Sequence, residues 1–241
     1  RHSMTLMNVS TQGSVAILTM TTAENRHNPA FAEAFLNCLD EIERNPEHKA
    51  LVITSSSEKS WSLGIDTDWL MPALKAQEFA EVSGFMHSMD AVFKRLLLFP
   101  MPVIAAINGH AFGNGAILSC ACDFRFMQSD RGFFCFPEVD LSIPFLPGML
   151  AFIKKAIPDY RFNEMMLTGR RVTAGELATD HVIEQACPNN ETLLNTALEF
   201  ASQFDKKRAI FAEHKKRLHK HIIDTIDTEN KPIIDAVQLV V

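Results

Sequence analysis

The sequence lacks the short motifs by which many nucleotide, metal and serine-hydrolase sites are identified. It contains no G-x-x-x-x-G-K-[ST] loop and no G-x-S-x-G turn, and Gly113-Asn114-Gly115 does not extend to G-x-G-x-x-G. The nine histidines include no H-E-x-x-H or similar ligand spacing. These absences argue against a P-loop protein and an ordinary α/β-hydrolase, and we expect no metal site.

The chain also has few features of membrane, secreted or nucleic-acid-binding proteins. Its longest apolar stretch, residues 96–107, is interrupted by Pro100 and Pro102. It is shorter than the roughly 20 residues that a bilayer span needs, so we expect no membrane partner. The five cysteines form no C-x-x-C pair, which predicts free core thiols in a reducing compartment. The net charge of −6 argues against general binding to nucleic acid.

The two ends of the chain lead to expectations about processing and location. Residues 1–3 precede Met4 and have the character of an expression remnant. No basic segment followed by an apolar one comes after Met4, so we expect no signal peptide. The C-terminal Leu239-Val240-Val241 is not a peroxisomal address, and we expect the protein in the cytoplasm.

Hydrophobic patterning predicts an α/β protein. The expected strands are 15–20, 51–54, 102–107, 124–127 and 133–136. The expected helices begin at Pro29 and cover 79–99, 149–157, 162–167 and 191–223. Because strands and helices alternate up to about residue 190, we assign residues 4–190 to one core. Residues 191–241 carry no strand signal and are assigned to a C-terminal helical region.

Two glycine-containing loops each lie between a strand and a helix. They are residues 61–66 (WSLGID) and 108–115 (NGHAFGNG). Peptide N–H groups at a helix start are unbonded and favour negative charge, so two converging loops could form an oxyanion hole. The other interpretation, left open by the glycines alone, is a pair of ordinary tight turns.

Two further features carry charge. Glu138 follows Pro137 and has apolar segments on both sides, which suits a general base with a raised pKa; it could equally be a strand-end glutamate facing water. Residues 213–224 (EHKKRLHKHIID) are the most basic run in the chain. They are interpreted either as a solvated helix face or as a site for an anionic group such as phosphate.

Four segments resemble, in order, the motifs of the enoyl-CoA hydratase/isomerase superfamily, also called the crotonase family. They are ENRHNPAF (24–31), LVITSSSEKSWSLGIDTDWL (51–70), MPVIAAINGHAFGNGAILSCACDFRF (101–126) and LTGRRVTAGELATDHVIEQACP (167–188). The resemblance implies an α/β, crotonase-like spiral of β-β-α units with a C-terminal helical trimerisation region. It also implies an acyl-CoA thioester ligand and a homotrimer or a dimer of trimers.

The same resemblance implies roles for individual residues. The backbone N–H groups of Ile65 and Asn114 form the oxyanion hole, with Asn114 standing where the family has glycine. Glu138 matches one of the two glutamates of the family's hydratases, whereas the other position is Ile117, which can neither accept nor donate a proton. This departure, together with the sequences of residues 127–136 (MQSDRGFFCF) and 142–149 (SIPFLPGM), resembles the Δ3,Δ2-enoyl-CoA isomerase branch.

Moving a double bond by one carbon needs one base, whereas adding water needs protons moved at two places, so a hydratase is disfavoured. The first hypothesis is therefore a Δ3,Δ2-enoyl-CoA isomerase that needs no cofactor, because CoA is part of the substrate. The alternatives are another one-carboxylate family enzyme (a thioester hydrolase or decarboxylase) and a catalytically silent acyl-CoA-binding protein. The expected pocket residues are Trp61, Leu63, Trp69, Ile117, Phe145 and Leu146. The candidate CoA contacts are Arg26, Asn28, Lys215 and Lys216.

Overall fold

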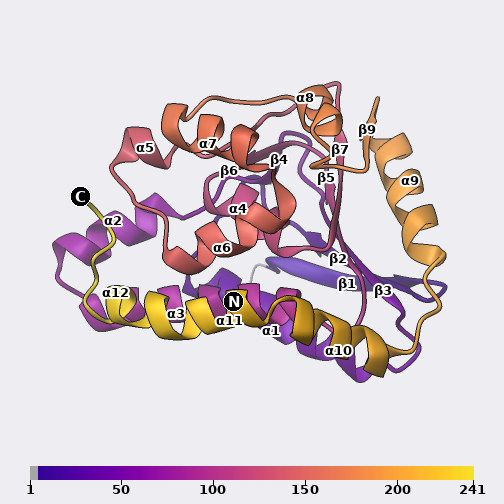
Figure 1. The fold of residues 1–241 in the computed structure, drawn as a ribbon, viewed down its shortest axis with the longest axis horizontal. Helices are drawn as coiled ribbons and strands as arrows, with labels where there is room; N and C mark the ends of the chain where they lie inside the picture. Colours follow the sequence, from indigo (N-terminus) through magenta and orange to yellow (C-terminus); the bar gives the residue numbers. More distant parts are fainter. Residues whose placement is uncertain (1–4) are drawn as a thin grey trace.

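Two β-sheets form the framework of the computed structural model, which describes residues 5–241 (Figure 1). The larger sheet has the order β1-β2-β3-β5-β7-β9 and the smaller one the order β4-β6-β8. Every neighbouring pair is parallel except β1 and β2. The strands are β1 (Met7–Gln12), β2 (Val15–Met20), β3 (Ala50–Ser55), β4 (Ser60–Ser62), β5 (Val103–Ile107), β6 (His110–Phe112), β7 (Phe124–Gln128), β8 (Phe134–Cys135) and β9 (Gln185–Cys187). The expression remnant expected at residues 1–3 lies outside the described residues.

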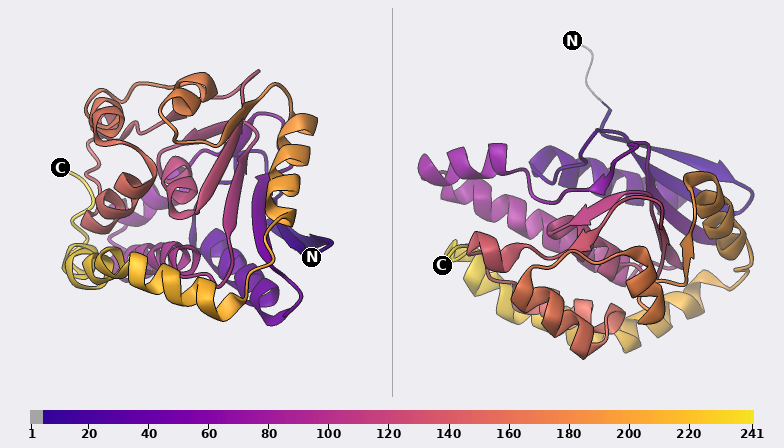
Figure 2. Two further views of the ribbon diagram at one scale, coloured as in Figure 1. Left: turned by 45° about the vertical axis from the view of Figure 1, so that its right-hand side comes forward. Right: turned by 90° about the horizontal axis from the view of Figure 1, so that it is seen from above.

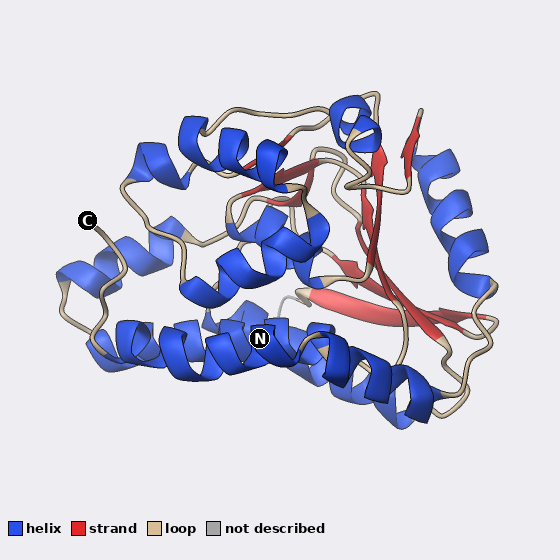
Figure 3. Ribbon diagram, viewed as in Figure 1, coloured by secondary structure: helices blue, strands red, loops and turns tan. Residues whose placement is uncertain are grey.

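The helices lie between and around the strands (Figure 3). They are α1 (Pro29–Arg44), α2 (Thr67–Lys75), α3 (Phe79–Leu97), α4 (Asn114–Ala121), α5 (Glu138–Leu141), α6 (Pro147–Ala156), α7 (Asp159–Thr168), α8 (Ala174–Thr179), α9 (Asn190–Ser202), α10 (Arg208–Leu218), α11 (Lys220–Thr225), a π-helical turn (Ile226–Asn230) and α12 (Lys231–Asp235). Within residues 5–241, no helix combines the length and apolar character needed to cross a bilayer.

The chain winds as a spiral that gives one strand of each turn to each sheet. The first turn is β3, β4 and then α2 and α3; the second is β5, β6 and α4; the third is β7, β8 and α5. Because β3, β5 and β7 pair in the large sheet and β4, β6 and β8 pair in the small one, the ends of β4, β6 and β8 lie side by side. The α/β prediction and the predicted spiral of β-β-α units are confirmed.

The predicted helix over 191–223 is wrong in one respect, because it is three helices rather than one. α9 ends at Ser202, residues 203–207 form a connection, and α10 begins at Arg208. The break allows α9 to pack on the large sheet while, after α10, α11 packs on α6 and α12 on α3 (Figure 2). Phe204, in the connection, packs against Phe124 at 5.8 Å between ring centroids and so anchors this change of direction.

Each face of the large sheet has its own apolar core. Val52 and Ile104 pack with Leu193 and Ala197 of α9, whereas Leu51 and Ile53 belong to the main core under the other helices. Alternating residues of a strand point to opposite faces, so a parallel sheet covered on both sides needs an apolar residue at every position. All five cysteines are free, as predicted, and four of them are buried.

Candidate active site

The loop after β4 approaches the loop after β6 so closely that it requires glycine. Gly64 has a φ of +85°, and a Cβ atom there would lie 2.7 Å from the carbonyl oxygen of Phe112 and 3.0 Å from the backbone nitrogen of Asn114. Both the backbone conformation and the close approach exclude a side chain. The two glycine-containing loops predicted from the sequence therefore meet.

The second loop turns sharply into the start of α4. Gly113 precedes the helix with φ and ψ of 56° and −124°, a conformation that other residues rarely adopt. The turn places Asn114 at the first helical position, where a backbone N–H has no partner inside the helix. A Cβ atom on Gly113 would lie 3.3 Å from Oε1 of Glu138, so the carboxyl group sits against this turn.

Two backbone donors remain unbonded where the loops meet. Among residues 5–241, neither the N–H of Ile65 nor that of Asn114 has a hydrogen-bond acceptor. Both residues line one cavity. An unpaired N–H facing a cavity is available to an acceptor on a ligand, and at the N-terminus of α4 it favours an oxygen that carries negative charge.

The carboxyl group of Glu138 is buried and only partly bonded. The residue begins α5, is 8% exposed, and its Oε2 has no hydrogen-bond partner among the described residues. Burial raises its pKa from the usual 4.5 to about 7, and its own backbone amide offsets part of that rise. A carboxyl group with a pKa near neutrality suits proton transfer in both directions.

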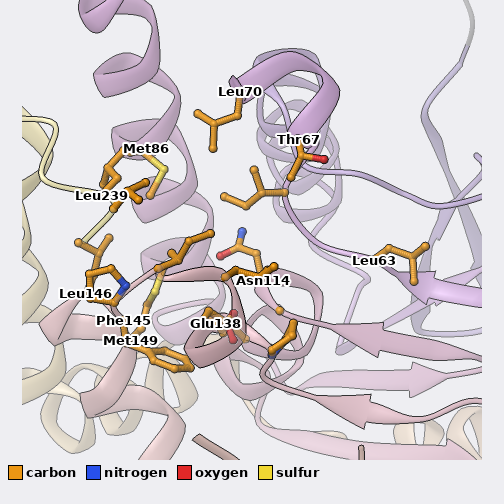
Figure 4. A pocket seen from close by; sticks show the side chains of 18 of the residues that line it. Leu63, Thr67, Leu70, Met86, Asn114, Glu138, Phe145, Leu146, Met149 and Leu239 are labelled. Atoms are coloured by element: carbon orange, nitrogen blue, oxygen red, sulfur yellow. The ribbon is translucent and has the colours of Figure 1, made fainter. Parts of the chain in front are cut away.

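The cavity around these groups is lined almost entirely by apolar side chains. Figure 4 shows Asn114 and Glu138 near its centre, with Phe145, Leu146 and Met149 on one side and Leu63 on the other. Among the described lining residues, Glu138 is the single carboxylate and Arg26 the single cation. No group of three or more His, Cys, Asp or Glu residues within 5–241 is arranged to hold a metal ion.

The structure brings together eight of the residues singled out from the sequence. The cavity is lined by Glu138, Ile65, Asn114, Ile117, Leu63, Phe145, Leu146 and Arg26. Ile117 is 2% exposed and presents an aliphatic side chain to the cavity, at the position where the resemblance leads us to expect a glutamate in a hydratase. Arg26 donates to the carbonyl oxygens of Leu63 and Ile65 and so braces the first loop.

The two tryptophans do not line the cavity, which corrects the prediction. Trp61 is fully buried, and its Nε1–H donates to the carbonyl oxygen of Ile53 at 3.2 Å in the core. Trp69 packs edge-on against Phe85 at 5.1 Å between ring centroids. Both tryptophans neighbour the motif along the chain, but that proximity does not determine which way a side chain points.

Two of the candidate CoA contacts are engaged inside the protein, which is a further correction. The side-chain oxygen of Asn28 caps α1 by accepting from the N–H of Phe31, and its amide donates to Asp66. Lys215 is buried and forms an ion pair with Asp123 at 2.8 Å. Lys216 is exposed on α10, and its proposed contact stays a prediction.

Sequence reasoning missed most of the apolar cavity wall. The additional lining residues come from α2, α3, the segment 141–144, α6 and the C-terminal tail, and they are Thr67, Leu70, Met71, Met86, Leu141, Ile143, Pro144, Met149, Leu239 and Val240. The helical periodicity of 79–99 identified the apolar face that contains Met86 but not what it faces. No sequence pattern connects Leu239 with Glu138, because only the path of the C-terminal helices brings them together.

A family model described as enoyl-CoA hydratase/isomerase matches residues 10–233. The human mitochondrial Delta(3,5)-Delta(2,4)-dienoyl-CoA isomerase is 29% identical over 202 residues, covering 80% of this chain and 60% of its own length. The peroxisomal enoyl-CoA delta isomerase 2 of Arabidopsis thaliana is 25% identical and is covered over 95% of its length. Carnitinyl-CoA dehydratase of Salmonella enteritidis is 34% identical over 72% of this chain and 62% of its own length.

Solved structures share the fold over nearly the whole chain. An apo enoyl-CoA isomerase of Mycobacterium tuberculosis has a TM-score of 0.84 at 21% identity and covers 96% of this chain and 98% of its own. An enoyl-CoA hydratase/isomerase family protein of Pseudomonas syringae has a TM-score of 0.85 at 20% identity, covering 95% and 96% of the two chains. At this level of identity the similarity establishes the crotonase fold, and the two named isomerases among the relatives place an isomerase branch within it.

Proposed function

We propose, from the premise that this chain belongs to the enoyl-CoA hydratase/isomerase family, that it is a Δ3,Δ2-enoyl-CoA isomerase. Its substrate would be a 3-enoyl-CoA and its product the 2-trans-enoyl-CoA. The observation that carries the proposal is the single carboxylate, Glu138, in an otherwise apolar cavity beside two unbonded backbone donors.

The reaction needs one group that moves one proton between two carbons. Ionised Glu138 takes a proton from C2, and the electron pair of the C–H bond shifts to give a dienolate with its charge on the thioester oxygen. The N–H groups of Ile65 and Asn114 hold that oxygen, and the N-terminus of α4 adds a favourable field. Glu138 then returns the proton to C4, which leaves the double bond between C2 and C3.

The pKa of Glu138 matches this task. At about 7, the group is partly ionised at neutral pH and remains basic enough to accept a proton from a weak carbon acid. Hydration would require a water molecule held next to the double bond by a second polar group. Ile117 offers only an aliphatic side chain at the matching position and lowers the capacity of the cavity to order water.

The test is to incubate the purified protein with 3-hexenoyl-CoA and follow the ultraviolet absorbance of the conjugated product, with free thiol measured in parallel. We expect conjugation without thiol release. Thiol release would instead indicate a thioester hydrolase. Release of CO₂ from a carboxylated acyl-CoA would indicate a decarboxylase. The absence of any reaction would indicate a binding protein.

The base is tested by Glu138→Gln, which keeps the size of the side chain and removes its proton-transfer capacity. We expect a loss of at least about 1,000-fold in kcat, toward the upper end of what a general base contributes. Glu199→Gln, a change at an exposed glutamate of α9, is the matched control and should retain full activity. Normal turnover by folded Glu138→Gln would refute the assignment of the base.

A further inference from the structure

A fully buried histidine lies behind the oxyanion donors and takes no part in the proposed proton transfer. His27 is in the loop between β2 and α1, is 0% exposed, and stacks on Phe31 with 4.3 Å between ring centroids. Neither of its ring nitrogens reaches solvent, yet both are hydrogen-bonded. A buried imidazole with two side-chain partners imposes geometry on those partners.

The backbone of His27 fixes the peptide that carries the first donor. Its N–H donates to the carbonyl oxygen of Gly64 at 2.8 Å, and its own carbonyl oxygen accepts from Asp66 at 2.9 Å. The carbonyl of Gly64 and the N–H of Ile65 belong to one trans peptide and point in opposite directions. Holding the carbonyl on His27 therefore turns the Ile65 N–H away from His27.

The ring of His27 holds the residue that carries the second donor. Nδ2 of Asn114 lies 2.7 Å from Nδ1 of His27, and Nε2 lies 3.0 Å from Oγ of Ser62. With the Asn114 amide assigned as the donor, Nδ1 accepts and the ring proton sits on Nε2. The hydroxyl of Ser62 then accepts from Nε2 and donates to the carbonyl oxygen of Asn25 at 2.9 Å, so the hydrogen bonds run in one direction from Asn114 to Asn25.

Burial favours the same neutral form of the ring. It lowers the pKa of His27 from 6.5 to about 3, and the nearby Arg26 contributes in the same direction. The ring is therefore uncharged at neutral pH, and Nδ1 remains an acceptor for Asn114.

We propose that His27 is a positioning residue that aligns both oxyanion donors, with its backbone setting the Ile65 N–H and its ring setting Asn114 at the start of α4. The inference rests on the proposed function, since it assumes that these two N–H groups hold a thioester oxygen. It also gives a physical reason for asparagine at position 114: the side-chain amide ties the first residue of α4 to the neighbouring loop, which glycine could not do.

Two conservative substitutions distinguish the contributions of the two ring nitrogens. His27→Asn keeps an acceptor near the place of Nδ1, whereas His27→Gln keeps a donor near the place of Nε2. We expect His27→Leu and His27→Gln to lower kcat for 3-hexenoyl-CoA by roughly 10- to 100-fold with KM changed less than about threefold, a part of the effect of losing one oxyanion donor. His27→Asn should retain most of the wild-type kcat, because it keeps the acceptor for Asn114.

The role through Asn114 is tested by a double-mutant cycle. Asn114→Ala keeps the backbone donor but removes its tether, so it should lower kcat about as much as His27→Leu, and the double variant should be no worse than either. Independent losses that multiply in the double variant would overturn the proposal. His48→Leu is the matched control: His48 is buried and hydrogen-bonded to Ile42 and Thr11, away from the cavity, so it should reduce thermal stability but leave kcat unchanged.

Binding of acetoacetyl-CoA gives a readout that does not depend on turnover, because its enolate absorbs in the ultraviolet and is favoured by an oxyanion hole. If wild type gives this signal but does not isomerise 3-hexenoyl-CoA, the proposed function fails while the role of His27 is still measured. We expect a weaker enolate signal in His27→Leu than in His48→Leu. Equal signals in these two variants would refute the positioning role.

Discussion

Glu138 illustrates how a single side chain couples activity to stability. Its carboxyl group is withdrawn from water without a compensating cation, and this raises its pKa to about 7. The same burial that suits Glu138 to the proposed role of a base near neutral pH makes its ionised form costly in the folded protein. Burial of the Glu138 carboxyl group is therefore the origin of both its raised pKa and its cost to the stability of the folded protein.

This coupling predicts the pH dependence of catalysis. Because the base must be ionised, kcat/KM should rise about tenfold per pH unit below 7 and level off above it. The measurement is a pH profile of kcat/KM with 3-hexenoyl-CoA. A profile that is flat from pH 5 to 8 would contradict the assignment of Glu138 as the titrating base.

The same shift predicts a stability difference for Glu138→Gln. Between the unfolded value of 4.5 and the folded value of about 7, the folded protein keeps a proton that the unfolded chain has lost, so this group destabilises the fold as pH rises. The variant should therefore gain stability relative to wild type across that range, by up to about 3 kcal/mol above pH 7. Denaturant titrations at pH 5 and pH 8 measure the difference.

At the scale of elements, α4 is positioned by the turn that precedes it. Gly113 allows the chain to leave β6 and start the helix at the cavity that Asn114 and Glu138 both line. At the other end, Arg125 and Lys155 donate to the carbonyl oxygen of Cys122, and cations there complement the helix dipole. The helix thus has an open N-terminus at the cavity and a bonded C-terminus in the core.

Gly113→Ala tests this element. Its Cβ atom would meet Glu138 at 3.3 Å, and its φ of +56° is unfavourable for alanine, so we expect a loss of about 1–3 kcal/mol in stability and at least tenfold in kcat. Gly84→Ala is the matched control, because Gly84 lies on the exposed face of α3 and a Cβ atom there would have no neighbouring atom within 4 Å. It should be neutral or stabilising by up to about 1 kcal/mol.

At the scale of the whole molecule, the C-terminal helices are fastened to the core by buried polar contacts. Lys215 of α10 donates to Asp123 and to the carbonyl oxygen of Leu96. In the π-helical turn, Asn230 accepts from the backbone N–H of Gly148 and donates to Asp90. These contacts direct the tail so that Leu239 and Val240 reach the cavity. The expected homotrimer or dimer of trimers stays a prediction.

Breaking the Lys215–Asp123 pair should destabilise the protein strongly. In Lys215→Met, Asp123 is left charged and largely buried, and we expect a loss of about 3–5 kcal/mol in free energy of unfolding. Adding Asp123→Asn should recover part of the loss, since no buried charge then remains without its partner. Lys216→Met, at the adjacent exposed position, should change stability by no more than about 0.5 kcal/mol. Chemical denaturation of the three variants distinguishes these outcomes.

Several parts of the fold and site could be predicted from local sequence signals. Asn28-Pro29 marks the start of α1, the periodicity of 79–99 predicts α3, which ends two residues earlier at Leu97, and the apolar run before Asn108 marks β5. Strand β8 lies within the predicted strand 133–136, whereas β4, β6 and β9 were not predicted, because strands of three residues carry too little periodicity to be recognised. The antiparallel β1 was not predicted either, because only the first of its six residues, Met7, is buried and the strand has no apolar pattern. The tryptophans and Lys215 were misplaced because their environment depends on distant segments.

The sequence by itself determined the α/β class and the two glycine-containing loops, since each depends on residue type at local positions. The spiral and the match of Ile117 to a hydratase glutamate followed from the resemblance of four segments to the family motifs. Tertiary structure alone decided that Glu138 is buried against Gly113, that His27 bonds to both loops, and that the tail closes the cavity. The physical reason is that burial, hydrogen-bond partners and pKa are set by groups far away along the chain, and those groups meet only when the spiral has closed.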